Sequence, residues 1–180
     1  IWVIKISDNV SNDDNEPEIL YMGLQHAREA ITGASMIFLM QYLCEQYGKD
    51  ERIKDLVDNR EFFIIPCFNP DGWEYNRSTD PNGGGMWRKN RNPVDSSMIL
   101  TKNGKGQNVT YDTSYTYSTF GVDLNRNWGV DWGNCGTPIL GSSTSCGSSS
   151  KSVDTYYGPA AFSEAETQAV RNFTKSRNFV

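Results

Sequence analysis

The sequence is short of several features that would mark a functional class. It contains one histidine and four cysteines among 180 residues. No apolar run approaches the roughly 18 residues of a membrane-spanning helix, and a formal net charge of -5 excludes the basic face that nucleic-acid binding requires. We therefore expect no membrane and no nucleic-acid partner, but one domain with a substantial core.

The N-terminus also lacks the basic segment followed by an apolar one that is typical of a signal peptide. Residues 1–7 read instead as a strand. We expect that a processed or trimmed region precedes them.

The four cysteines fall into two groups. Cys44 lies on a predicted helical face and Cys67 in an apolar strand, so both are expected to be buried small hydrophobes. Cys135 and Cys146 lie in a loop rich in Gly, Ser and Thr. We expect a disulfide between them, which would stabilise the fold by about 2–4 kcal/mol.

The first half of the chain predicts strands and helices in alternation. Residues 1–7 and 18–24 read as strands, joined by an acidic connection that is expected to be solvated rather than a calcium site. A helix follows, with Gly48 as its stop signal; its apolar face comprises Met36, Leu39, Met40, Leu43, Cys44 and Tyr47. Residues 50–58 predict a short second helix, and the apolar run at 60–68 predicts a central strand covered on both faces.

The second half is less regular. Residues 69–72 (Asn-Pro-Asp-Gly) predict a turn, and 78–119 show no strong period. Residues 121–128 read as a short strand. Ser163 opens a capping box for a helix to about Arg177, and 178–180 look like the start of another strand.

Strands alternating with helices are typical of an α/β sheet, in which ligands bind beyond the carboxyl ends of strands. His26 and Glu29 follow a predicted strand at that point. A histidine nitrogen and a carboxylate oxygen are normal zinc ligands, and a catalytic zinc takes three protein ligands plus water. The chain has no second histidine to complete the set. It therefore indicates a zinc hydrolase, and an incomplete one.

His-x-x-Glu alone is a weak signal, but other segments accompany it in a fixed order. They are residues 26–29 (HARE), 69–72 (NPDG), 87–91 (WRKNR), 122–128 (VDLNRNW), 157–159 (YGP) and 162–164 (FSE). In this order they closely resemble the catalytic domain of the zinc metallocarboxypeptidases of the carboxypeptidase A/B/T type, along essentially the whole chain. The resemblance implies an α/β fold with a mixed central β-sheet flanked by helices.

The resemblance also implies roles for individual residues. His26 and Glu29 match the first two ligands of the single Zn2+ of a complete catalytic domain. Arg91 matches the arginine that stabilises the oxyanion, and Arg28 matches an arginine of the outer substrate subsites. Asn125 and Arg126 match the pair that binds the free C-terminal carboxylate of a peptide.

The chemistry of the arginines agrees with those roles. A guanidinium binds a carboxylate through two parallel hydrogen bonds, and one lost oxyanion donor costs roughly 2.7–4 kcal/mol. Other matched residues read as structural: Asn69 and Asp71 as a turn, Trp87 and Trp128 as packing. Asp123 reads equally as an acceptor for a metal ligand or as a strand end.

In the resembled family a third ligand, a histidine, follows the 163–177 helix, and the glutamate general base lies farther on. Residues 1–180 are therefore expected to be a catalytic domain trimmed at both ends, holding about four strands of a larger sheet and inactive alone. The whole protein would hydrolyse C-terminal peptide bonds with metal-activated water. We expect it to be monomeric and secreted or extracytoplasmic.

Two alternatives remain open. A related zinc amide hydrolase could act on cell-wall peptides or N-acyl amino acids. A non-catalytic pseudo-peptidase could keep the carboxylate pocket after loss of its base. The C-terminal residue preferred by the enzyme depends on sequence outside this chain.

Overall fold

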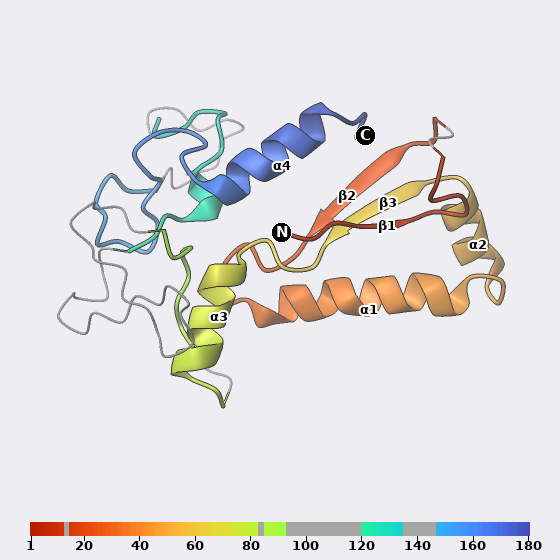
Figure 1. Cartoon of the computed structure of the whole chain (residues 1–180), viewed down its shortest axis with the longest axis horizontal. Helices are drawn as coiled ribbons and strands as arrows, with labels where there is room; N and C mark the ends of the chain where they lie inside the picture. The colour runs from red at the N-terminus through yellow and green to blue at the C-terminus, as the bar shows by residue number, and fades with distance from the viewer. Residues whose placement is uncertain (13–14, 83–84, 93–119, 135–146) are drawn as a thin grey trace, which may run out of the picture.

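The computed structural model describes residues 1–12, 15–82, 85–92, 120–134 and 147–180. Strands, α1 and α2 occupy one end of the molecule, and α3, the loops and the start of α4 gather at the other (Figure 1). The described elements are β1 (Ile4–Ile6), β2 (Glu18–Met22), α1 (Ala30–Gln46), α2 (Glu51–Asp58), β3 (Glu61–Ile65), α3 (Pro70–Thr79), the 3-10 helix η1 (Leu124–Arg126) and α4 (Ala165–Lys175).

The sheet is mixed, with β3 in the middle. β1 pairs with β3 antiparallel and β2 pairs with β3 parallel, in the order β1-β3-β2. All five residues of β3 are buried. This confirms the predicted central strand and the α/β fold class.

Successive β3 side chains point to opposite faces of the sheet, and each face has its own cover. Phe62 and Ile64 pack with α1 and α2 in one core cluster. Phe63 lies 5.6 Å, centroid to centroid, from Phe173 of α4, and Ile65 packs with Val170 of α4. Accordingly, α1 lies below the sheet and α4 above it in Figure 1.

The end of the chain returns to this sheet. Phe179 forms a parallel bridge with Glu18, and the Val180 amide donates to the Glu18 carbonyl at 3.1 Å. The predicted strand start at 178–180 is present as this single bridge beside β2.

The two predicted N-terminal helices are confirmed. α1 ends before Gly48, whose φ of +80° favours glycine. Asp50 caps α2 by accepting from the Arg52 amide. Both features follow directly from local sequence.

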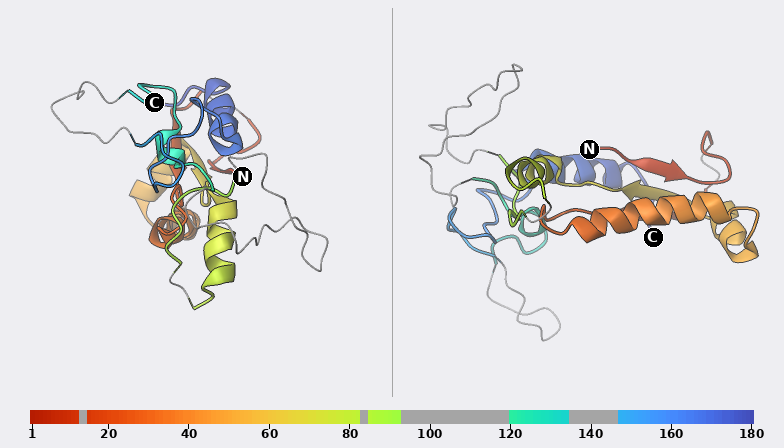
Figure 2. Two further views of the ribbon diagram at one scale, coloured as in Figure 1. Left: turned by 90° about the vertical axis from the view of Figure 1, so that its left-hand side faces the viewer. Right: turned by 90° about the horizontal axis from the view of Figure 1, so that it is seen from below.

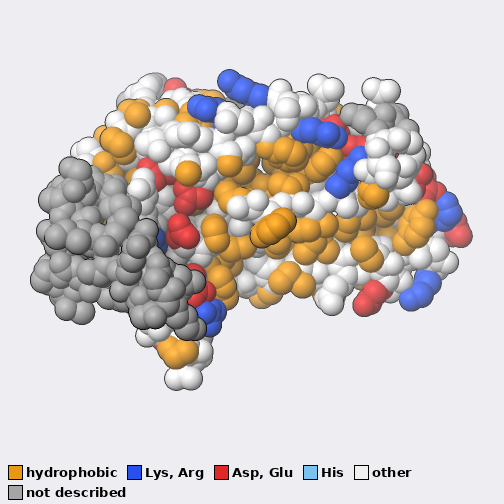
Figure 3. Space-filling view, in the orientation of Figure 1, with side chains coloured by type: hydrophobic (Ala, Val, Ile, Leu, Met, Phe, Trp, Pro, Cys, Tyr) orange, Lys and Arg blue, Asp and Glu red, His pale blue; other side chains and the backbone are white. Residues whose placement is uncertain are grey.

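The predicted burial of Cys44 is wrong. Cys44 is exposed, and Cys67 is only half-buried. The predicted face itself is correct, since Leu43 is in the core and Met36, Leu39 and Met40 pack against it; Cys44 lies at the edge of this face and stays exposed. The opposite side of α1 also carries apolar residues, Ile31 and Phe38, which face outward. Hydrophobic side chains accordingly gather on the surface over α1 in Figure 3.

Three local predictions are corrected. Residues 70–79 form α3, where the sequence predicted only a turn, because Asn69 caps a helix with Pro70 at its start. Residues 121–128 contain η1 rather than a strand, because the Asp123 side chain caps it. The α4 helix is present, but its cap is Glu164; Ser163 donates to the Glu164 carboxylate instead of capping.

Cys135 and Cys146 lie outside the described residues. Among the residues that are described, no helix is long and apolar enough to cross a membrane.

Candidate functional site

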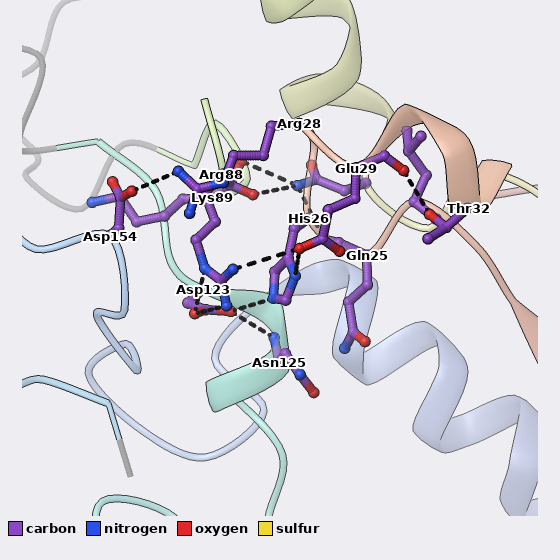
Figure 4. A network of polar contacts seen from close by, with 12 residues as sticks. Gln25, His26, Arg28, Glu29, Thr32, Arg88, Lys89, Asp123, Asn125 and Asp154 are labelled. Carbon is purple, nitrogen blue, oxygen red and sulfur yellow. Dashed lines mark hydrogen bonds and ion pairs between the residues drawn. The ribbon is translucent and has the colours of Figure 1, made fainter. Parts of the chain in front are cut away.

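The candidate site forms where three segments meet beyond the carboxyl ends of β2 and β3. They are the turn carrying His26, the segment carrying Arg88, and Asp123 at the start of η1 (Figure 4). The Ala27 amide donates to the Arg88 carbonyl at 3.0 Å, which ties the first two segments together. Figure 2 shows these loops at one end of the molecule, beside α3.

His26 lies between two carboxylates. Its Nδ1 is 2.9 Å from Glu29 Oε1, and its Nε2 is 3.1 Å from Asp123 Oδ1. The His26 side chain is 9% exposed, whereas the Glu29 side chain is 42% exposed. Glu29 therefore lies on the open side of the site and Asp123 on the buried side.

Asp123 joins the imidazole to Arg88. Its buried carboxylate also receives hydrogen bonds from Arg88 Nε at 3.0 Å and from the Asn125 amide at 3.0 Å. Burial alone would raise the pKa of Asp123, but the hydrogen bond from His26 and the Arg88 charge outweigh it, and the pKa lies below its usual range. Asp123 is thus ionised and orients His26.

Arg88 is a site residue that the sequence reasoning missed. Its NH2 lies 2.9 Å from Asp123 Oδ2, and its NH1 lies 3.7 Å from Glu29 Oε1. The Arg88 side chain is only 12% exposed, so most of it is buried beside the site. The only signal in the sequence was that Arg88 shares the 87–91 segment with Arg91.

Arg91 lies in a different environment. Its guanidinium carbon is 3.9 Å from the Tyr75 ring centre, 4.5 Å from that of Trp87 and 4.7 Å from that of Phe120. Such stacking stabilises a cation against ring faces. The structure therefore brings Arg88, not Arg91, against Glu29 and Asp123.

The two predicted carboxylate-binding residues follow Asp123 directly in η1. Asn125 is exposed and Arg126 half-buried, both on η1. Arg126 NH1 donates to the Asn125 carbonyl, and Arg126 Nε is buried without a hydrogen-bond partner among the described residues. A buried donor without a partner is costly, and an incoming anion would satisfy it.

Arg28 lies at the outer edge of the site. Its NH1 contacts Asp154 Oδ2 at 3.0 Å and donates to the Met86 carbonyl at 3.4 Å. The side chain keeps 29% of its surface exposed, enough for a ligand to reach it.

The donor geometry at His26 and Glu29 fits one metal ion. Ligand atoms at two corners of a zinc tetrahedron lie about 3.3 Å apart for bonds of about 2.0–2.2 Å. His26 Nδ1 and Glu29 Oε1 are 2.9 Å apart, so a small movement of the Glu29 side chain suffices. The contact of Nε2 with Asp123 leaves Nδ1 for the metal, as is usual for ligating histidines. Within the described ranges, no group of three His, Cys, Asp or Glu side chains could hold a metal.

Comparison with known proteins is consistent with this geometry. The sequence model of the zinc carboxypeptidase family matches residues 1–180. A zinc carboxypeptidase of Saccharothrix mutabilis subsp. capreolus is 39% identical over 136 residues, which are 76% of this chain and 26% of that protein. A zinc carboxypeptidase of Simulium vittatum is 32% identical over 93% of this chain and 43% of its own length. The chain thus spans less than half of the curated relatives that it matches.

Solved structures agree. The crystal structure of thrombin activatable fibrinolysis inhibitor superposes with a TM-score of 0.70 at 26% identity, over 98% of this chain and 35% of the other. Carboxypeptidase A from Helicoverpa armigera gives a TM-score of 0.65 at 29% identity, over 95% and 33% of the two chains. The described fold is therefore similar to part of these larger structures.

Proposed function

Because the chain belongs to the zinc carboxypeptidase family, we propose that it forms part of the active site of an exopeptidase that removes C-terminal residues from peptides and proteins. The observation that carries the proposal is the contact of His26 with Glu29 on one ring nitrogen and with Asp123 on the other, with Arg88 against both carboxylates.

In this proposal His26 Nδ1 and a Glu29 oxygen hold one zinc ion. When bound, zinc supplies Lewis acidity and lowers the pKa of its water from about 15.7 to about 7. Asp123 keeps the proton on Nε2 and leaves Nδ1 as the donor to the metal. A third ligand comes from outside the described residues.

We assign the oxyanion role to Arg88 rather than to Arg91. The Arg88 guanidinium lies beside Glu29, where a scissile carbonyl next to the metal would develop negative charge. Its orientation is held in advance by a hydrogen bond and an ion-pair contact to Asp123, and donors oriented in advance are the ones that stabilise a developing oxyanion. Arg91 is held among aromatic rings and serves the core.

Asn125 and Arg126 bind the free C-terminal carboxylate of the substrate in this proposal. The Arg126 guanidinium offers a planar fork for a carboxylate, and its Nε has no hydrogen-bond partner among the described residues. Arg28, at the outer edge, contacts the peptide upstream of the cleaved bond.

The rest of the proposal concerns the whole protein. Residues 1–180 form one part of a larger catalytic domain, as the coverage of the relatives indicates. We expect the isolated chain not to hydrolyse peptides efficiently, since its described residues contain no group of three side chains that could hold a metal. The protein acts outside the cytoplasm as a monomer, and the expected Cys135–Cys146 disulfide would suit that location.

The proposal is tested with the full-length protein loaded with zinc. A peptide with a free C-terminus and the same peptide with a C-terminal amide are compared by mass spectrometry. We expect stepwise loss of C-terminal residues from the free peptide alone, and that the Arg126→Ala variant raises KM for it. Equal cleavage of both peptides would favour a different zinc amide hydrolase. A zinc-loaded but inactive protein would favour a non-catalytic binding module.

A further inference from the structure

Asn69 lies directly behind the candidate site. It is fully buried, at 0% exposure, between β3 and α3. The sequence reasoning assigned it to a turn. Its backbone amide donates to the Leu24 carbonyl at 3.0 Å, so Asn69 is fixed beside the segment that leads to His26.

The side chain of Asn69 bridges three segments. Its Nδ2 lies 3.4 Å from the Gln25 carbonyl, next to His26. The same nitrogen lies 3.5 Å from the Arg88 carbonyl and 3.1 Å from that of Lys89. Its Oδ1 accepts from the Gly72 amide at 3.0 Å, at the start of α3.

The junction around Asn69 has no spare room. A Cβ atom placed on Gly72 would lie 2.5 Å from the Lys89 carbonyl oxygen, 2.7 Å from Asn69 Oδ1 and 2.8 Å from Ala27 Cβ. The segment carrying His26 and the segment carrying Arg88 therefore lie close together, with Gly72 on one side of them and the side-chain amide of Asn69 on the other.

We propose that Asn69 is a positioning residue for catalysis: its side-chain amide sets the separation between the segment carrying His26 and Glu29 and the segment carrying Arg88. This rests on the function proposed above. At this position only a side-chain NH2 group can donate to the carbonyls of both segments, because a carboxylate cannot donate and a hydroxyl is too short to reach them.

The positioning role can be separated from the capping role. Serine is also a good N-cap, so Asn69→Ser keeps an acceptor for the Gly72 amide while removing the NH2 group. A matched control is Asp50→Ala, which removes the cap of α2 at the opposite end of the molecule. Asp50 touches none of the site residues described above.

The test uses the full-length, zinc-loaded protein with two readouts. The first is kcat and KM for a peptide with a free C-terminus. The second is the hydrogen exchange rate of the Ala27 amide, which reports on its bond to the Arg88 carbonyl without turnover. For Asn69→Ser we expect kcat to fall about 10- to 100-fold with KM nearly unchanged, and Ala27 to exchange faster. For Asp50→Ala we expect a lower Tm with kcat and Ala27 exchange unchanged.

Two results would overturn the proposal. One is Ala27 exchange and kcat in Asn69→Ser within twofold of the unaltered protein. The other is an equal loss of kcat in Asp50→Ala, which would mean that any loss of stability reduces turnover. If the unaltered protein does not cleave peptides, the proposed function fails, while Ala27 exchange still decides whether Asn69 holds the two segments together.

Discussion

His26 Nε2 lies 3.1 Å from Asp123 Oδ1, although 97 residues separate the two in the chain. The carboxylate also contacts Arg88. One buried acid therefore orients the His26 imidazole and the Arg88 guanidinium at the same time.

Asp123→Asn should weaken zinc binding by the full-length protein about 10- to 100-fold, as loss of a carboxylate behind a ligating histidine commonly does. The reason is that a neutral amide no longer stabilises the form of His26 that carries its proton on Nε2 and leaves the Nδ1 lone pair for the metal. Competition with a coloured chelator measures the affinity.

Asp55→Asn is the matched control, because Asp55 is exposed on α2 and far from the site. It should leave zinc affinity unchanged. An Asp123→Asn variant with unaltered zinc affinity would mean that the contact with His26 has no role at the metal.

Arg88→Lys and Arg91→Lys should have different effects. Arg88→Lys loses the guanidinium fork at the site, so kcat should fall about 100- to 1,000-fold. Arg91→Lys loses stacking on Tyr75, Trp87 and Phe120, so it should lower Tm and change kcat by only a few-fold. Steady-state kinetics and thermal unfolding on both variants make the comparison. The opposite ranking would restore the oxyanion role to Arg91.

Because of Lys89, the free energy of unfolding should increase as the pH is raised in the alkaline range. Burial lowers its pKa to about 8, the Arg91 charge acts in the same direction, and Asp154 opposes it. The unfolded chain, with a lysine pKa of about 10.4, binds more protons than the folded one between about pH 8 and 10.4, so the free energy of unfolding rises through that range. Relative to Lys89→Met, the unaltered protein should gain about 2 kcal/mol from pH 7 to 10.

Urea unfolding at several pH values measures this difference. Lys49→Met, at an exposed position, should follow the pH dependence of the unaltered protein. A pH-independent difference between the Lys89→Met variant and the unaltered protein would contradict the expected pKa.

Arg177 should stabilise the sheet through two buried acids. Its NH2 lies 2.7 Å from Glu18 Oε1 and 3.0 Å from Glu61 Oε2, and these carboxylates are 5% and 1% exposed. Removing one partner of a buried ion pair costs about 3–5 kcal/mol. Because Arg177 itself is 23% exposed and Lys5 still pairs with Glu61, we expect Arg177→Met to cost about 3 kcal/mol, near the lower limit.

Thermal and urea unfolding provide the measurement. Arg77→Met is the control, because Arg77 pairs with Glu74 at the surface and exposed pairs contribute roughly 0–1 kcal/mol. Equal losses of unfolding free energy in the two variants would show that the buried carboxylates of Glu18 and Glu61 do not need Arg177 as a partner.

Elements with strong local signals were predicted well. β3 was recognised from an almost continuously apolar run, and α2 from its charged outer positions. α3 was missed because Asn69-Pro70 is typical of turns as well as of helix starts. Asn69 becomes a helix cap only when the residues after it form helical hydrogen bonds. Cys44 was misplaced because it lies at the edge of the predicted face of α1, whose other members Met36, Leu39, Met40 and Leu43 do pack in the core.

The sequence by itself determined the pairing of His26 with Glu29, since a spacing of three positions brings the two side chains within reach of each other. It also determined the family, through short segments in a fixed order. Only the tertiary structure decided which arginine of residues 87–91 lies at the site and that Asp123 contacts His26. The physical reason is that these contacts join residues dozens of positions apart, whose separation depends on how the loops pack behind the sheet.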